Sequence, residues 1–276
     1  MRIVSFQEFD SIYQKSSKSI YEYWTTQMQA DIATHCYLWR PGLFDFRTYL
    51  QASSIRFYKA YRSFAAEENV KTVCDIGGFW GVFPITLKSL GYDVAMTESL
   101  KYYNDSFQDL FKYIAEQGVA IFDYDPFQPN VPSLGCFDVI TVMAILEHYP
   151  HSLKDFMKNI ISLISPEGQV YMEVPNIAFW PKRINFLFGQ TPLVKIEHIY
   201  NSEVPFIGHH HEFTLSELRN LVALSGLSVI SENLYNYSPG TLPGIKTLIR
   251  HPFWFIVFSM LKDSRECLAV SCKLKK

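Results

Sequence analysis

The stretch Val70–Glu98, VKTVCDIGGFWGVFPITLKSLGYDVAMTE, decides the fold of this chain. It begins with a short, mostly apolar run that suits a buried strand and ends at Gly77–Gly78. A helical pattern follows, with Pro84 in its first turn and Gly91 as its stop. A second apolar run ends at Glu98. The stretch therefore predicts a strand, a helix and a second strand in one βαβ unit.

The two corners of this unit carry groups that suit a nucleoside. Glycines such as Gly77 let the backbone approach a ligand closely at the start of a helix. Glu98 ends the second strand 21 positions later, where a carboxylate can accept hydrogen bonds from ribose hydroxyls. Asp75 would repel a pyrophosphate and suit a cationic amino group, and the loop lacks the Lys-Ser/Thr of a P-loop. The predicted ligand contains a nucleoside and need not carry phosphates.

The segment Asp75–Gly81, DIGGFWG, resembles motif I of the class I S-adenosylmethionine-dependent methyltransferases, written acid-x-Gly-x-Gly-x-Gly. Phe79 stands at the middle glycine of that motif. The resemblance implies that Asp75 interacts with the methionine ammonium, that the glycines allow close approach, and that Glu98 holds the ribose. The cofactor-binding residues implied for this loop are Asp75, Gly77, Gly78, Phe79 and Gly81.

Later runs extend the resemblance. Residues 137–151, FDVITVMAILEHYPH, and 163–176, LISPEGQVYMEVPN, are similar to a pattern of many bacterial small-molecule and glycan methyltransferases. Residues 208–227, GHHHEFTLSELRNLVALSGL, are similar to a third run of the same group, with His211 where arginine is usual. Within the first run, the implied cofactor-binding residues are Met143 and Ala144.

Asp123-Tyr124-Asp125 follows the third expected strand, Val119–Phe122. The resemblance implies that an acid here contacts the adenine amino group and that an adjacent side chain, Tyr124, packs on the ring. Asp123 is the first choice and Asp125 the alternative, because the register of such a short strand is open by a residue or two.

Two histidines are candidate catalytic residues. Methyl transfer from a sulfonium is an in-line displacement, and a base is needed only when the acceptor starts protonated. His148 and His209 could take a hydroxyl proton near pH 7, although either could instead order its loop by hydrogen bonding. Adjacent histidines on an extended chain point in different directions, so Glu147, His148, His209 and His211 do not by themselves predict a metal site, and no metal is expected.

The whole chain fits an α/β fold. Residues 1–69 are rich in aromatic residues and predict an N-terminal helical cap, with helices on either side of Pro41–Gly42. Residues 70–276 are expected to form a Rossmann-like doubly wound sheet of seven strands, mostly parallel with an antiparallel last strand, with an insertion at about 177–211. Further elements are expected as helices at Tyr103–Gln117, Ser152–Ile164 and Gly244–Leu261, a helix capped by Thr214 and Glu217, a strand at Gln169–Val174 after a Ser165–Gly168 turn, and a strand at Cys267–Leu274.

Composition limits the class of protein. The chain has 276 residues, 48% of them hydrophobic and 19% charged, which supports a sizeable core. A net charge of -2 gives no global basic field for nucleic acid. Five scattered cysteines fit a reducing compartment, so a cytoplasmic protein is expected. No signal peptide is recognised, and Pro252–Leu261 is too short to span a bilayer. The basic and apolar segment Lys246–Leu261 is expected to pack on the sheet in preference to a membrane surface.

The sequence therefore predicts an S-adenosylmethionine-dependent methyltransferase that acts on a small molecule or glycan at oxygen, with the cap and the insertion forming the acceptor site. Two alternatives stay open. Phe79 at a glycine position motivates a catalytically inactive, methyltransferase-like binding subunit. A nucleotide-dependent oxidoreductase shares the first βαβ unit, but it would need the complete glycine pattern, and Pro175-Asn176 argues against it.

Overall fold

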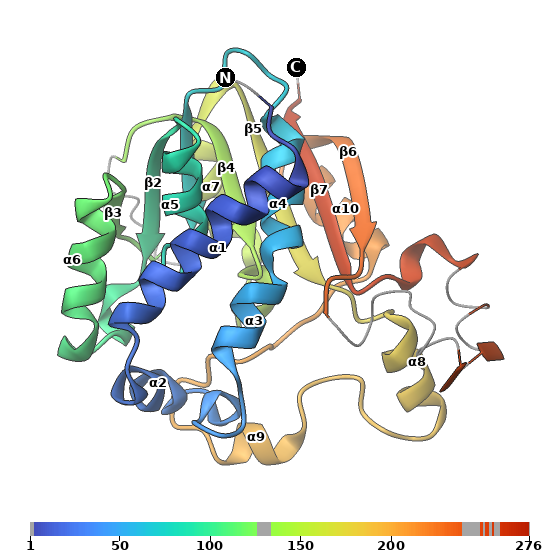
Figure 1. Cartoon of the computed structure of the whole chain (residues 1–276). Helices are drawn as coiled ribbons and strands as arrows, with labels where there is room; N and C mark the ends of the chain where they lie inside the picture. Colours follow the sequence, from blue (N-terminus) through green and yellow to red (C-terminus); the bar gives the residue numbers. More distant parts are fainter. Residues whose placement is uncertain are drawn as a thin grey trace.

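A mixed sheet forms the centre of the computed structural model, which describes residues 3–125, 134–238, 249–250, 252–253, 256 and 260–275. The described residues form seven strands in the order β3-β2-β1-β4-β5-β7-β6 (Figure 1). All neighbouring pairs are parallel except those of β7, which is antiparallel to both β5 and β6. This confirms the predicted fold class. The strands are β1 (Thr72–Ile76), β2 (Asp93–Glu98), β3 (Ala120–Asp123), β4 (Phe137–Met143), β5 (Ile164–Pro175), β6 (Leu227–Tyr235) and β7 (Cys267–Leu274).

Helices cover both faces of the sheet because its central strands are apolar on both sides. Along β1, Val73 belongs to one core cluster and Cys74 to the other, as the alternation of a strand requires. The first cluster includes side chains of α1 (Phe6–Tyr23), α4 (Ser54–Phe64), α5 (Val82–Ser89) and α6 (Gln108–Glu116). The second includes side chains of α7 (Leu153–Ser162) and α10 (Leu215–Leu224).

The N-terminal segment is helical, as predicted. It contains α1, α2 (Thr26–Ala33), the short 3-10 helix η1 (Tyr37–Trp39), α3 (Phe46–Ala52) and α4. The turn at Pro41–Gly42 separates η1 from α3. The boundary predicted between residues 69 and 70 falls between α4 and β1, but α1 and α4 share a core cluster with the first strands. Figure 1 shows α2 beyond the carboxyl ends of the parallel strands, near α9 (Ile196–Tyr200).

The βαβ unit has the predicted form, and the helix after it is shorter than predicted. The helix α5 begins at Val82, so Pro84 lies in its first turn, where no intrahelical hydrogen bond is lost. The 3-10 helix η2 (Leu100–Tyr102) precedes the predicted helix, a second 3-10 turn, η3 (Asp105–Phe107), replaces its start, and α6 begins only at Gln108. The Tyr103 hydroxyl is bonded to Glu98, which holds this segment across the end of β2.

The second half differs from the prediction at β5. Residues Ser165–Gly168 do not form a turn before the strand but lie within it as an irregularity, because Phe137 pairs with Ile164 whereas Val139 pairs with Gln169. Ser152 caps α7, and Thr214 and Glu217 form the predicted capping box of α10.

The predicted insertion contains α8 (Trp180–Leu187) and α9, and the 3-10 helix η5 (Lys262–Ser264) precedes β7. Most of the predicted helix Gly244–Leu261 lies outside the described residues. None of the helices in the described ranges is both long enough and apolar enough to cross a membrane.

Candidate functional site

The turn after β1 brings the backbone close to the ends of β2 and β4. Gly77 has a φ of +63°, and a Cβ there would clash with the Ile145 side chain, which follows β4. A Cβ on Gly78 would lie 2.9 Å from the Cβ of Met96 in β2. The left-handed backbone therefore favours glycine at Gly77, and the close approach of Met96 leaves no room for a side chain at Gly78.

Phe79 adopts a left-handed backbone conformation that favours glycine. Its φ is +51°, in the left-handed region that costs a non-glycine residue about 1–2 kcal/mol. The ring compensates by stacking on Trp80, with ring centroids 4.4 Å apart, and by packing near Phe46 of α3. Trp80 is 1% exposed and packs against Trp24 between α1 and α2. The two aromatic residues thus anchor the loop to the N-terminal helices, while the backbone keeps its glycine-like path.

Glu98 closes over this loop from the end of β2. One carboxylate oxygen accepts a hydrogen bond from the Phe79 amide, and the other accepts one from the Tyr103 hydroxyl at 2.9 Å. Burial raises the pKa of Glu98 to about 8, against the lowering effect of these donors. A carboxylate has further lone pairs, so these two bonds leave acceptor capacity for a ligand hydroxyl.

Asp75 lies beneath the loop and not on its outer surface. Its Oδ1 accepts a hydrogen bond from Thr141 Oγ1 of β4 at 2.6 Å, and burial raises its pKa to about 7. A Cβ added to Gly78 would be 3.3 Å from its Oδ2. Asp75 therefore supports the turn from below, through the neighbouring strand.

The end of β3 carries the other predicted cofactor acids. Asp123 pairs in register with Glu98 and is exposed, and its Oδ1 accepts a hydrogen bond from the Leu100 amide at 3.0 Å. Asp125 forms an ion pair with Lys101 at 2.9 Å. Tyr124 points into the second core cluster. Asp123 thus lies beside Glu98 at the same edge of the sheet, whereas the Asp125 carboxylate is engaged by a lysine.

The exit of β4 forms the opposite wall of the turn. Met143 is buried and pairs in register with Glu173 of β5. Ala144 has a φ of +55°, and its amide donates to the Glu173 carbonyl oxygen at 2.9 Å. This sharp turn separates β4 from the 3-10 helix η4 (Leu146–His148), which carries the next polar groups.

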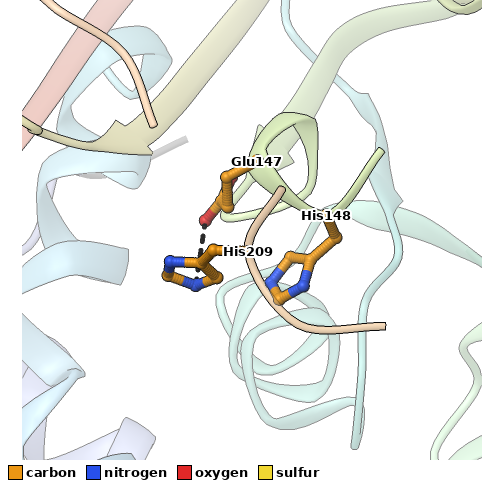
Figure 2. A group of neighbouring side chains, drawn as sticks. All are labelled: Glu147, His148 and His209. Carbon is orange, nitrogen blue, oxygen red and sulfur yellow. Dashed lines mark ion pairs between the residues drawn. The ribbon is translucent and has the colours of Figure 1, made fainter. Parts of the chain in front are cut away.

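Glu147, His148 and His209 converge beyond this turn (Figure 2). One possible ligand atom from each lies within 4.8 Å of the others. The loop that carries His209 is bonded to η4, because the amides of His210 and His211 donate to the Glu147 carbonyl oxygen at 2.6 and 3.2 Å. The fold thus supplies the convergence that the sequence could not show. His211 is not in the group and instead pairs with Glu217.

Hydrogen bonds set the tautomer of both imidazoles. His148 Nδ1 lies 2.7 Å from the Ile207 carbonyl oxygen, which only accepts, so Nδ1 is the donor. His209 Nδ1 lies 3.0 Å from the Glu212 carboxylate. In each neutral ring the lone pair is therefore on Nε2. Burial lowers the pKa of His148 to about 3, which keeps this ring neutral.

Glu147 has an unusual environment for a carboxylate. It is 1% exposed, and neither side-chain oxygen has a hydrogen-bond partner among the described residues. The nearest cationic candidate is His209, whose Nε2 is 4.0 Å from Oε1. Burial raises the pKa of Glu147 to about 7.

Two further polar groups at this end of the sheet escaped the sequence analysis. Glu212 holds His209 and also pairs with Lys182 of α8. Glu173 of β5 is fully buried and accepts from Arg56 Nε of α4 at 2.8 Å. Glu173, an acid within the apolar run Val170–Pro175, was the signal for the second pair, because a buried charge needs a partner.

A comparison with protein-family models shows which family this chain belongs to. The model of the methyltransferase domain family matches residues 46–232, well over half of the chain. The chain belongs to the class I S-adenosylmethionine-dependent methyltransferases. The match begins at α3 and so includes helices that the sequence motifs left out. Membership in this family rules out the alternative prediction of a nucleotide-dependent oxidoreductase. The cofactor of the family is S-adenosylmethionine.

Solved structures share the methyltransferase fold at low identity. One is magnesium protoporphyrin IX methyltransferase from Synechocystis with bound S-adenosylhomocysteine, which has a TM-score of 0.55 and 13% identity and covers 87% of this chain and 92% of its own. Another is a putative methyltransferase of Haloferax volcanii in complex with the activator Trm112, with a TM-score of 0.54, 15% identity and coverages of 84% and 95%. No curated protein sequence matches the chain.

Proposed function

We propose that this methyltransferase methylates a hydroxyl oxygen of a small molecule or glycan, with His209 as the base. The observation that carries the proposal is the imidazole of His209, held by Glu212 at 3.0 Å and aimed at the exit of β4. A hydroxyl acceptor must lose its proton as its oxygen attacks the methyl group, whereas a neutral amine needs no base for the attack. A carboxylate on Nδ1 orients such an imidazole and stabilises the imidazolium it becomes.

His209 suits this role better than His148. The His209 side chain is 34% exposed and so is accessible to an acceptor. The His148 ring is held by the Ile207 carbonyl, and burial lowers its pKa to about 3, far from the value that suits proton transfer at neutral pH. We assign His148 a positioning role in the metal-free protein.

The acceptor would lie between the N-terminal helices and the predicted insertion. The two segments are hydrogen-bonded to each other, because the Glu203 amide donates to the Thr34 carbonyl and the Ile207 amide donates to the His35 carbonyl, each at 2.9 Å. Trp39 of η1 faces His148, with ring centroids 6.3 Å apart. Aromatic side chains offer a flat apolar surface to a sugar or another ring.

The cofactor would lie along the carboxyl ends of β1, β2 and β3, where doubly wound sheets bind their ligands. In this proposal the glycine turn faces the cofactor, Glu98 holds the ribose, and Asp123 reaches the adenine. Asp75 would act on the methionine ammonium from beneath the turn, through its buried carboxylate.

The test compares His209→Ala with His211→Ala, using release of S-adenosylhomocysteine from S-adenosylmethionine in a pool of small hydroxylated acceptors. Loss of a general base lowers kcat by about 10²–10⁴-fold. We expect this loss for His209→Ala and not for His211→Ala, whose side chain pairs with Glu217 outside the group. Both variants should bind S-adenosylhomocysteine like the wild type. Equal turnover in the two variants would overturn the role of His209.

A further inference from the structure

We infer that Glu147, His148 and His209 form a binding site for a divalent first-row transition-metal ion. Two imidazole nitrogens and one carboxylate oxygen form a ligand set that such ions prefer in proteins. The three residues come from two segments about 60 positions apart, and backbone hydrogen bonds from the His209 loop to Glu147 hold these segments together. The site is therefore built by the fold and not by a local run of histidines.

The spacing of the three groups fits a cation after a small contraction. Ligand atoms no more than 4.8 Å apart lie within about 2.8 Å of a common point, whereas zinc bonds to nitrogen and oxygen are about 2.0–2.2 Å long. Movements of less than about 1 Å, within reach of side-chain torsions, would close this difference.

The surroundings of the imidazoles are those of metal ligands. A ligating histidine usually donates its other ring N–H to a carboxylate or a backbone carbonyl, which fixes the ring and its tautomer. His209 has Glu212 in this position, and His148 has the Ile207 carbonyl oxygen. Both arrangements leave the Nε2 lone pair for a cation.

Glu147 is the independent observation that points to a ligand. A buried carboxylate without hydrogen-bond donors is costly, and proteins normally pair such groups or use them to coordinate metals. Glu98, another buried glutamate at this edge, has two donors, whereas Glu147 has none among the described residues. A cation between Glu147 and the imidazoles would supply the missing partner.

The inference deepens the proposed function and rests on it for the identity of the reaction. Three protein ligands leave coordination positions open for an oxygen atom of the acceptor. A coordinated hydroxyl would release its proton to solvent, and its oxygen would form the new C–O bond as the S–C bond breaks, leaving the electron pair on sulfur. In the loaded protein His209 is then a ligand, and the cation takes over its role as the group that activates the hydroxyl.

The experiment titrates the full chain, without a polyhistidine tag, with MnCl2 and measures free Mn²⁺ by electron paramagnetic resonance. We expect one site per chain in the wild type, and binding at least about 100-fold weaker in Glu147→Gln and His209→Ala. His211→Ala is the matched control and should bind like the wild type, because its imidazole lies outside the group. Mn²⁺ is a suitable probe because thiols such as the exposed Cys136 are poor ligands for it.

Binding of S-adenosylhomocysteine by each variant shows whether a negative result contradicts the metal site or the proposed function. A wild type that binds the cofactor product but no Mn²⁺ up to millimolar concentration overturns the metal site and leaves the proposed function intact. If His211→Ala weakens Mn²⁺ binding as much as His209→Ala does, the proposed metal site is also wrong. The ion would then bind to the consecutive histidines 209–211. Stoichiometric Mn²⁺ binding without hydroxyl methylation would support the site and contradict the proposed function.

Discussion

Glu98 and Glu147 are both buried at the ligand-binding edge of the sheet, but the fold gives them different hydrogen-bond partners. Glu98 ends β2 and bonds to the Phe79 amide and the Tyr103 hydroxyl. Glu147 follows β4 and has no hydrogen-bond partner in the described part of the chain. Both carboxylate oxygens of Glu98 therefore have a hydrogen-bond donor within the protein. Glu147 lacks such partners within the described ranges, and in our proposal the metal ion takes their place.

The two regions also differ in how they are assembled. The cofactor side comes from one βαβ unit, Val70–Glu98, whose parts are neighbours in sequence. The acceptor side needs η4, the loop of His209, and a segment after α2 that is bonded to residues 202–207. Substitutions on the cofactor side should therefore alter only the affinity for the cofactor. Substitutions on the proposed acceptor side should alter both folding stability and methyl transfer.

The largest expected effect is on stability, at Glu147. Burial raises its folded-state pKa to about 7, above the value of about 4.3 in an unfolded chain. An acid with a raised folded-state pKa binds its proton more tightly in the folded state than in the unfolded state. Its contribution to folding stability therefore falls as the pH rises from about 4.3 to 7. Glu147→Gln carries no charge and avoids this loss. We expect it to exceed the wild type by on the order of 3 kcal/mol at pH 8.

Urea unfolding in the presence of a chelator measures this difference at pH 5 and pH 8. The advantage of Glu147→Gln should fall to about 1 kcal/mol at pH 5, where the wild-type carboxyl is protonated in the folded state and mostly ionised in the unfolded state. A difference that does not change with pH would contradict the raised folded-state pKa of the buried Glu147 carboxyl.

A smaller effect is expected from Glu98→Ala, on cofactor affinity. A hydrogen bond to a charged group contributes about 1.5–3 kcal/mol, so losing one to the ribose should weaken binding of S-adenosylhomocysteine by about 10- to 100-fold. Isothermal titration measures this loss. Asp93→Ala, at the exposed start of the same strand, is the control and should bind normally. Unchanged affinity in Glu98→Ala would remove Glu98 from the cofactor site.

The smallest effect is expected from Phe79→Gly. Glycine adopts the left-handed conformation of this position without strain, so the path of the loop should not change. We expect the affinity for S-adenosylhomocysteine to change by less than about 0.7 kcal/mol, a threefold factor. A much larger loss would mean that the phenyl ring, and not only the backbone, contacts the cofactor.

Much of the cofactor side could be predicted from sequence because its signals are local. Strand periodicity, the glycine turn, the stop at Gly91 and the carboxylate at Glu98 all lie within one short stretch, and motif resemblance gave the family. The same reasoning failed for the start of α6, where the bond between Tyr103 and Glu98 holds the chain in 3-10 turns. It also misread Ser165–Gly168, because the pairing of β5 with β4 decides whether those residues form a turn or a bulge.

By itself the sequence determined the order of the elements in the βαβ unit, its glycine turn and the methyltransferase family. Only the tertiary structure decided which polar groups meet on the acceptor side. His209 reaches Glu147 through backbone hydrogen bonds between distant segments, and Arg56 reaches Glu173 across more than 100 positions. No periodicity or spacing encodes such pairs, since they depend on how helices and loops pack once the sheet has formed. The glycine turn could be predicted from the sequence because its backbone geometry depends on the residues within it.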